Sequence, residues 1–281
     1  MAVPTEFVKR AGKDNWVLAR RVLPPEYATW NKKWGAPWGH LAGVPGLAKV
    51  ARWAGLDYQL APIFGPFAFQ GNSSTRTYEF PWAYHVVRPT SGLRVLEIGG
   101  ALSGLQFVLA RAGSEVHNVD PFFDYGGGEY RSDPEKRHTQ LNRVFKTDVK
   151  LYKSTLPDAN IEGTFDVIYS VSTLEHIPLD ALEETLTFAR RLLKSEGRIV
   201  LTVDLFLDLE PFCDRKFNKW GSNVSTKWIA DVLDMVLTEG DSSELFGYEE
   251  FFAERILECL EDYAVNIGYP QLAQLMVFSA P

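Results

Sequence analysis

Titratable side chains that follow short apolar segments are the first candidates for chemistry. His176 ends the triplet Leu174-Glu175-His176, and its imidazole is able to take a proton from a hydroxyl group near neutral pH. Asp204 follows the apolar segment 198–203 and is a second candidate base. For His176, a structural role in fixing its loop is an equally open interpretation. Three weaker candidates for acid-base chemistry are His85, His138 and Tyr125.

A glycine-rich turn lies between an expected strand at 94–98 and an expected helix at 103–112. Three glycines supply the flexible backbone that a sharp turn needs: Gly99, Gly100 and Gly104. Ser103 is placed to cap the helix, and Gln106 is placed to complete a capping box. A strand, loop and helix in this order present backbone N–H groups at a helix N-terminus, which suits a nucleotide-like ligand.

Two kinds of ligand fit this turn. The spacing Gly99-x-Ala101-x-x-Gly104, with Asp120 about 20 residues after the turn, fits a relaxed dinucleotide fingerprint. The methyl group of Ala101 obstructs the close backbone approach that a pyrophosphate needs, which counts against a dinucleotide. An NAD-dependent oxidoreductase is therefore the weaker alternative.

The other interpretation uses more of the chain. Glu97-x-Gly99-x-Ala101 resembles motif I of class I S-adenosylmethionine-dependent methyltransferases, an acidic residue followed by three alternating glycines. The chain departs from that pattern because Ala101 replaces one glycine and the last glycine, Gly104, comes one residue late. The segment 172–178 is similar to the Leu-Glu-His signature of small-molecule methyltransferases. The resemblance extends from residue 90 to residue 205 or nearby.

The resemblance implies a set of residues that bind S-adenosyl-L-methionine. Asp120, after the second expected strand, would accept hydrogen bonds from both ribose hydroxyls. Asp148 and Val149, after the third expected strand, would contact the adenine, and Phe122 would cover its opposite ring face. Contacts to the methionine part of the cofactor are implied for Glu97, Gly99, Gly100, Ala101 and Ser170.

Arg76 lies just before the region of resemblance. Its guanidinium is placed to clamp a carboxylate of the ligand, and a structural pair with Glu79 is an equally open interpretation.

The resemblance also implies a small-molecule acceptor. Methyltransferases that act on the amino groups of bases carry an Asn/Asp-Pro-Pro-aromatic motif after the fourth strand, where this chain has Ser170-Val171-Ser172-Thr173. We therefore expect O-methylation of a hydroxylated acceptor such as a sugar, a glycan or a secondary metabolite, and no nucleic acid. A non-catalytic, methyltransferase-like scaffold with a degenerate glycine motif is a further alternative.

Alternating strand and helix signals predict an α/β fold with a doubly wound, Rossmann-like, mostly parallel sheet. Strands are expected at 94–98, 115–119, 144–147, 165–170 and 198–203, with an antiparallel C-terminal strand at 275–278, at or near the sheet edge. Further helices are expected to be capped by Ser132, by Asp180 with a stop at Gly197, and by Ser225 or Thr226, and another around 249–263.

The chain is expected to have two parts. Residues 1–90 are rich in aromatic residues and read as an irregular N-terminal extension or lid, and residues 91–281 as the methyltransferase domain with an acceptor-side insertion at about 205–224. The aromatic side chains either pack the extension onto the domain or line an acceptor pocket. They are Trp30, Trp34, Trp38, Trp53, Phe64, Phe67 and Phe69.

Composition excludes several classes. The 281 residues are 46% hydrophobic and carry a net charge of −7, with no basic footprint for nucleic acid. Cys213 and Cys259 lack metal-ligand spacing, so we expect neither disulfides nor a metal site. The sequence shows no apolar leader and no long apolar segment, so a cytoplasmic protein without membrane insertion is expected. A homodimer is left open.

Overall fold

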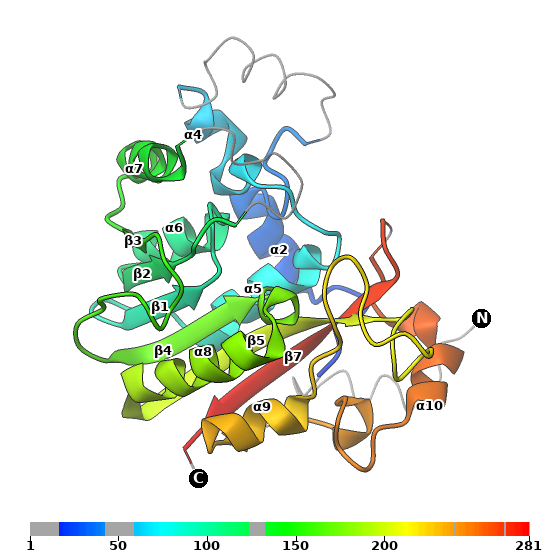
Figure 1. Cartoon of the computed structure of the whole chain (residues 1–281). Helices are drawn as coiled ribbons and strands as arrows, with labels where there is room; N and C mark the ends of the chain where they lie inside the picture. Colours follow the sequence, from blue (N-terminus) through cyan, green and yellow to red (C-terminus); the bar gives the residue numbers. More distant parts are fainter. Residues whose placement is uncertain (1–16, 43–58, 124–132, 239, 267, 281) are drawn as a thin grey trace.

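A seven-stranded sheet runs through the centre of the molecule, with the strand order β3-β2-β1-β4-β5-β7-β6 (Figure 1). This computed structural model describes residues 17–42, 59–123, 133–238, 240–266 and 268–280. The strands are β1 (Arg94–Ile98), β2 (Glu115–Val119), β3 (Lys150–Tyr152), β4 (Phe165–Val171), β5 (Leu193–Phe206), β6 (Val236–Leu237) and β7 (Gln271–Ser279). Strands β1 to β5 pair in parallel, and β7 is antiparallel to both β5 and β6. The predicted fold class is confirmed.

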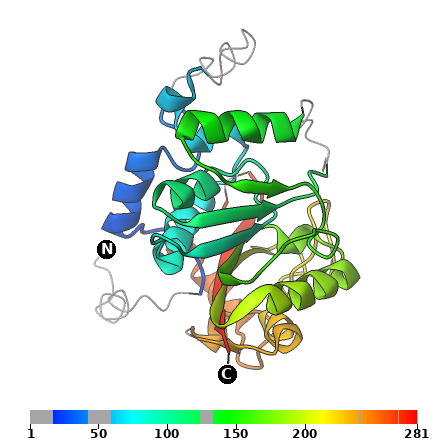
Figure 2. The same cartoon turned by 90° about the vertical axis from the view of Figure 1, so that its left-hand side faces the viewer.

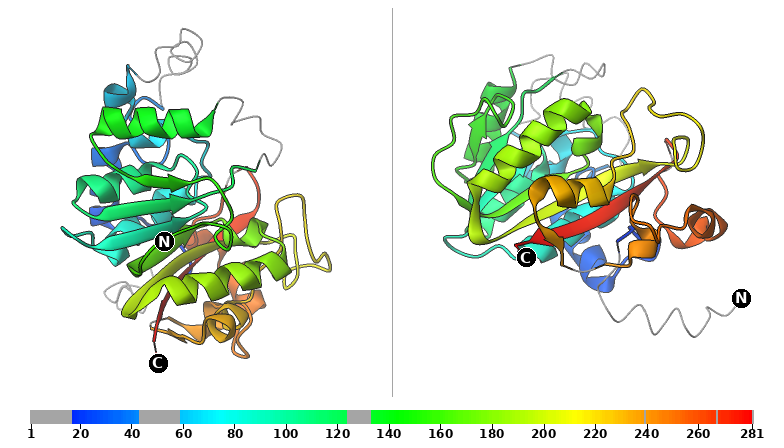
Figure 3. Two further views of the ribbon diagram at one scale, coloured as in Figure 1. Left: turned by 60° about the vertical axis from the view of Figure 1, so that its left-hand side comes forward. Right: turned by 60° about the horizontal axis from the view of Figure 1, so that its bottom comes forward.

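Helices cover both faces of this sheet (Figures 1 and 2). One face carries α2 (Pro25–Trp34), α5 (Arg76–Val87), α6 (Gly104–Arg111) and α7 (Pro134–Phe145). The other face carries α8 (Leu179–Leu192) and α9 (Thr226–Leu233), which lie side by side (Figure 3). Shorter helices are α4 (Ala61–Phe64), α10 (Ala253–Glu258), η1 (Pro66–Phe69), η2 (Leu174–His176), η3 (Ser242–Glu244) and η4 (Leu260–Asp262). Adjacent strand residues point to opposite cores, as Val95 and Leu96 do.

The third strand is not where the sequence predicts it. Helix α7 has Asp133 as its N-cap and continues through Phe145, because Leu141 and Phe145 are one helical turn apart and are both buried. Lys146, with a φ of 54°, ends the helix. The predicted strand at 144–147 is therefore wrong, and β3 begins at Lys150. Ser132, the predicted cap, lies outside the described residues.

Helix α5 occupies twelve residues of the region that was predicted to be irregular. Pro81 lies inside the helix, and proline usually breaks helices, so the sequence pattern did not predict α5. The helix packs against β4 and β5. As a consequence, part of the N-terminal region belongs to the same core as the sheet.

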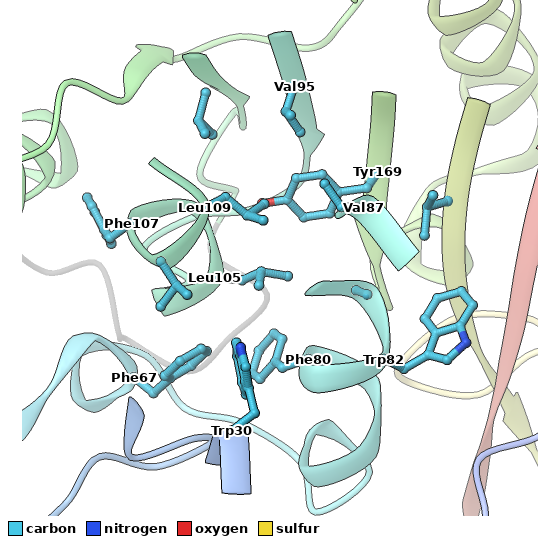
Figure 4. Packing of buried hydrophobic residues seen from close by; sticks show 14 of the residues in the cluster. Trp30, Phe67, Phe80, Trp82, Val87, Val95, Leu105, Phe107, Leu109 and Tyr169 are labelled. Carbon is cyan, nitrogen blue, oxygen red and sulfur yellow. The ribbon is translucent and has the colours of Figure 1, made fainter. Parts of the chain in front are cut away.

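An aromatic layer joins the N-terminal region to α6 (Figure 4). The ring of Phe67 lies 5.6 Å from that of Trp30 and 4.9 Å from that of Phe80. A Cβ atom at Gly104 would come within 2.7 Å of the Phe67 ring, so this glycine lets η1 pack closely on α6. Trp30, Phe67 and Phe80 are buried in the core, whereas Trp38 is 48% exposed. Trp53 lies outside the described residues.

Helices α8 and α9 differ in how they begin. Ser225 is the N-cap of α9 and accepts a hydrogen bond from the Trp228 N–H at 3.1 Å, as predicted. Helix α8 instead begins after Pro178 without a side-chain cap, so the predicted Asp180 cap is wrong. Strand β5 follows α8 directly, which places Gly197 inside the strand rather than at the end of the helix.

Residues near the beginning of the chain complete the sheet beside β7. The Leu275 N–H donates to the Val17 carbonyl at 2.8 Å, and the Ala19 N–H donates to the Ala273 carbonyl at 2.9 Å. Strand β6 pairs with the C-terminal end of β7. The predicted antiparallel strand, β7, therefore lies one position from the sheet edge. Within the described part of the chain, no helix is long and apolar enough to cross a membrane.

Candidate active site

Backbone strain is concentrated where three neighbouring strands end. Ala101 follows β1, Phe122 follows β2 and Ser172 follows β4, and their φ angles are 42°, 54° and 41°. Residues other than glycine rarely adopt positive φ, and such strain is typical of ligand-binding sites. The carboxyl edge of the sheet is also where ligands bind in open α/β folds. The strained residues therefore mark this edge as the site.

Asp120 is fixed against the glycine turn. Its Oδ2 accepts a hydrogen bond from the Ala101 N–H at 2.8 Å, and its Oδ1 accepts one from the Phe122 N–H at 2.6 Å. Burial raises the pKa of Asp120, and the two N–H donors act against that rise. Each carboxylate oxygen keeps a further acceptor position, which suits a ligand with paired hydroxyl groups.

The buried side-chain amides of Asn118 and Gln106 hold the glycine turn in place. Asn118 accepts from the Gly100 N–H at 3.2 Å and donates to the Ala101 carbonyl at 2.9 Å. Gln106 also donates to the Ala101 carbonyl, at 3.2 Å, instead of closing the predicted capping box with Ser103. The Ser103 hydroxyl does accept from Leu105, as predicted. The alanine that departs from the glycine pattern is thus held on both sides in its strained conformation.

Glu97 lies under the same turn. A Cβ atom at Gly100 would come within 2.3 Å of the Glu97 carboxyl group, so only glycine fits above it. Burial raises the pKa of Glu97 to about 8. Its Oε2 atom is buried and has no hydrogen-bond partner. An unpaired buried carboxyl oxygen fits a cationic ligand group such as the ammonium of S-adenosylmethionine.

Two predicted adenine contacts lie at the other end of the sheet. Asp148 and Val149 precede β3, and Lys150, the first residue of β3, pairs with His117 in β2. Asp120 instead donates its N–H to the carbonyl of Tyr152 at 3.0 Å, so the residues after Tyr152 share its edge. The expectation that Asp148 and Val149 follow the third strand is therefore wrong, because α7 is longer and β3 starts later than predicted.

Ser170 lies inside β4, one residue before the strand ends, and its hydroxyl donates to the Ile98 carbonyl at 2.9 Å. The side chain of Ser170 thus links β4 to β1. Two weaker candidates for acid-base chemistry lie elsewhere: His85 stacks on Tyr27, and His138 is buried beside Gln106 at 2.9 Å. Tyr125 lies outside the described residues.

A second group of polar residues lies where β4 and β5 end. Arg76, at the start of α5, donates to Glu79 Oε2 and to the Ser172 hydroxyl, both at 2.5 Å. Thr202 of β5 also donates to Glu79, at 2.5 Å. Burial would raise the pKa of Glu79, but Arg76 and the two hydroxyl groups hold it below its ordinary value. Of the two interpretations of Arg76, the structural pair with Glu79 is present.

Asp204, Glu175 and His176 meet beside this pair. Glu175 Oε1 accepts from the Asp204 N–H at 3.1 Å and lies 3.9 Å from His176 Nε2. Asp204 Oδ2 accepts from Gln271 of β7 at 2.6 Å. Burial raises the pKa of Glu175 to about 7 and raises that of Asp204 well above its ordinary value, although Arg76 opposes both shifts. The structure therefore brings together the two predicted catalytic residues.

The connection after β5 covers this group. The His176 Nδ1 atom is hydrogen-bonded to the Trp220 carbonyl, and the Ser222 N–H donates to the Glu175 carbonyl at 3.2 Å. Gly221 allows this close approach, because a Cβ atom there would lie 1.9 Å from the same carbonyl. The connection predicted at about 205–224 begins after Phe206 and is packed on η2.

The glycine turn after β1 and the polar residues at the ends of β4 and β5 are neighbours. The Thr173 hydroxyl donates to the Gly99 carbonyl at 3.1 Å. The Thr173 side chain also fills the space where a Cβ atom of Gly99 would lie, at 2.1 Å. The segment from Ser172 to His176 therefore has the glycine turn on one side and Asp204 on the other.

A Rossmann-like sheet with an antiparallel β7, a glycine turn after β1 and a buried acid after β2 defines a class of nucleotide-type cofactor proteins. Within this class, a family model described as a methyltransferase domain matches residues 71–231, which is more than half of the chain. The chain belongs to this family and is an S-adenosyl-L-methionine-dependent methyltransferase. The match decides against the NAD-dependent alternative.

The chain is similar to several solved structures. The YcgJ protein from Bacillus subtilis is 12% identical, with a TM-score of 0.52, over 72% of this chain and 98% of that chain. Phosphoethanolamine N-methyltransferase 2 from Haemonchus contortus, in complex with S-adenosyl-L-methionine, is 16% identical, with a TM-score of 0.48, over 84% of this chain and 59% of that one. Magnesium protoporphyrin IX methyltransferase from Synechocystis, with bound cofactor, is 14% identical, with a TM-score of 0.45, over 83% and 94%. No curated protein sequence matches the chain significantly.

Proposed function

We propose that this methyltransferase transfers the methyl group of S-adenosyl-L-methionine to a hydroxyl group of a small acceptor. The observation that carries the proposal is the arrangement of Glu175, His176 and Asp204 beside the glycine turn, since proton acceptors are needed where a hydroxyl group reacts. Bound S-adenosyl-L-methionine supplies an activated methyl group on a sulfonium. The protein has to bind the cofactor, align the acceptor and receive its proton.

The cofactor residues follow from the carboxyl edge of β1 and β2. Asp120 would hold the ribose hydroxyls, and the backbone of Gly99, Gly100 and Ala101 would pass close to the methionine part. The buried Glu97 carboxyl group would face the ammonium. Phe122, buried at this edge, would cover the adenine. Residues after Tyr152 replace Asp148 and Val149 in this assignment because they share the edge of Asp120.

Titration with S-adenosylhomocysteine tests the cofactor site. Asp120→Ala removes a charged hydrogen-bond acceptor and is expected to weaken binding at least about tenfold, since such bonds contribute about 1.5–3 kcal/mol. Asp148→Ala is the matched control, because this exposed aspartate lies at the opposite end of β3. Calorimetry should give wild-type affinity for the control. An equal loss of S-adenosylhomocysteine affinity in both variants would support Asp148 as an adenine contact.

His176 is proposed as the group that receives the acceptor proton, with Asp204 beside it. His176→Ala is expected to lower kcat by about 10²–10⁴-fold on a hydroxylated acceptor, because a positioned base contributes that much. Affinity for S-adenosylhomocysteine should stay within about twofold of wild type, since no cofactor residue is changed. Acceptors are found by mass spectrometry of sugars, glycans and phenols incubated with methyl-labelled cofactor. Full turnover by the variant at every pH would exclude this role.

A further inference from the structure

The end of β5 gathers more carboxyl groups than positive charges. Glu79, Glu175 and Asp204 bring three carboxyl groups, and Arg76 brings one guanidinium. Arg76 Nη1 lies 2.5 Å from Glu79 but 3.9 Å from Asp204 Oδ1. Arg76 therefore pairs mainly with Glu79, and its positive charge compensates the negative charges of Glu175 and Asp204 only weakly.

Hydrogen-bond counting shows which oxygen atoms lack donors. The Ser172 hydroxyl has one hydrogen but lies near two carboxyl oxygens, Glu79 Oε1 at 2.6 Å and Asp204 Oδ1 at 3.1 Å. The shorter bond takes the hydrogen, so Asp204 Oδ1 is left without it. Glu175 Oε2 has no hydrogen-bond partner although the residue is 1% exposed. A buried carboxylate with undonated oxygens requires a cation or a proton.

His176 lies beside the Glu175 carboxyl group, with Nε2 3.9 Å from Oε1. Its Nδ1 is hydrogen-bonded to the Trp220 carbonyl, which makes Nδ1 a protonated nitrogen, so that in the neutral imidazole the lone pair belongs to Nε2. Metal-binding histidines are commonly oriented in this way, by a carbonyl that accepts from the other ring nitrogen. One atom each from Glu175, His176 and Asp204 lie within 4.8 Å of one another. To coordinate one ion at about 2.1 Å, these atoms must move closer together than they lie here.

We propose that Glu175, His176 and Asp204 form a binding site for one divalent transition-metal ion. Two carboxylates and one imidazole favour Mn²⁺, Co²⁺ or Zn²⁺ over Mg²⁺, which prefers oxygen ligands alone. The His176 side chain is 25% exposed, so solvent reaches this edge of the proposed site. Three protein ligands leave coordination positions for an acceptor oxygen.

This inference rests on the proposed function in one respect: the ion would bind the acceptor hydroxyl and lower its pKa. When the ion is bound, His176 is one of its ligands and the acceptor hydroxyl releases its proton to solvent at the partly exposed edge of the site. In the metal-free enzyme His176 receives that proton. Acceptors with two adjacent oxygen atoms are the class that such an ion would bind best, since they chelate it.

The experiment uses the full chain after treatment with a chelator and removal of the chelator. Mn²⁺ is added, and the electron paramagnetic resonance signal of free Mn²⁺ measures uptake. We expect one Mn²⁺ per chain, competition by Zn²⁺, and at least tenfold weaker binding by Glu175→Gln and by His176→Gln. Glu184→Gln, an exposed residue of α8, is the matched control and should bind as wild type does.

Circular dichroism and S-adenosylhomocysteine titration establish that each variant is folded. His176→Gln changes a partly exposed side chain and serves if Glu175→Gln does not fold. The proposal is overturned if the wild-type chain takes up no stoichiometric Mn²⁺ or Zn²⁺, in which case protons neutralise the carboxyl groups. It is also overturned if His176→Gln binds the ion as tightly as wild type. Failure of the proposed O-methylation has a different signature: the wild-type chain binds Mn²⁺ but methylates none of the hydroxylated acceptors.

Discussion

Whether the Glu97 carboxyl group is charged depends on whether a cationic ligand group faces it. Burial raises its pKa to about 8, against 4.5 for an ordinary glutamate. Between these two values the folded chain holds a proton that the unfolded chain releases. The contribution of Glu97 to the free energy of unfolding therefore falls as the pH rises from about 5 to 8, by on the order of 4 kcal/mol.

The variant Glu97→Gln should not lose this stability, because its amide remains neutral. We expect the variant to unfold at higher urea concentration than wild type at pH 8.5, with the difference shrinking toward pH 5. Urea unfolding of the cofactor-free proteins at four pH values measures this. Glu183→Gln, on the exposed side of α8, is the control and should follow wild type. A difference that does not change with pH would contradict the raised pKa.

Single residues also show how far sequence reasoning reaches. The glycine turn and Asp120 could be predicted because they follow strands with clear apolar patterns, so their positions on the edge follow from topology. The position of Asp148 could not be predicted, because it depends on where the third strand lies, and β3 begins several residues later than expected. Glu79 and Gln271 reach the end of β5 from distant parts of the chain, and nothing in local sequence relates them to Asp204.

At the scale of elements, α5 is attached to the sheet through a buried ion pair. Glu79 is fully buried and receives hydrogen bonds from Arg76, Ser172 and Thr202. Glu79→Gln leaves Arg76 without its nearest countercharge, so we expect the free energy of unfolding to fall by about 3 kcal/mol. Urea unfolding at pH 7 measures this change.

The exposed ion pair of α9 provides the control for this prediction. Lys227 and Asp231 are equally close, at 2.6 Å, but face water. Asp231→Asn should therefore leave the unfolding midpoint unchanged. If both substitutions have the same effect, burial is not what makes the Arg76–Glu79 pair important.

Local sequence signals predict some helices and strands correctly and miss others, for physical reasons. Strands β1 and β4 have compact apolar patterns between turn residues, and α9 has a serine cap, so local signals and the fold agree. Helix α5 contains Pro81, and its burial on β4 and β5 outweighs the local cost of the proline. In α7, Val144 and Phe145 read as a strand only when the helical spacing with Leu141 is ignored.

At the scale of the whole molecule, the N-terminal residues close the region around β7. Leu18 is completely buried in a cluster with Leu205, Ile256, Tyr263 and Leu272. Leu18→Ala should lower the free energy of unfolding by about 2–5 kcal/mol, the usual cost of such a cavity. Leu179→Ala, at an exposed leucine, is the control for urea unfolding. An unchanged midpoint for Leu18→Ala would show that this packing does not contribute to stability.

The pairing of residues 17–19 with β7 also constrains the order of events during synthesis on the ribosome. Val17 and Ala19 bond to residues 273–275, so their partners emerge from the exit tunnel long after they do. Strand β5 likewise pairs with β7, from Arg198 to Phe206, and these contacts form only after β7 has been synthesised. Contacts with such large sequence separation slow folding. The nascent chain must therefore hold a parallel sheet with an open edge until β7 has been synthesised, and an open sheet edge of this kind is prone to aggregation.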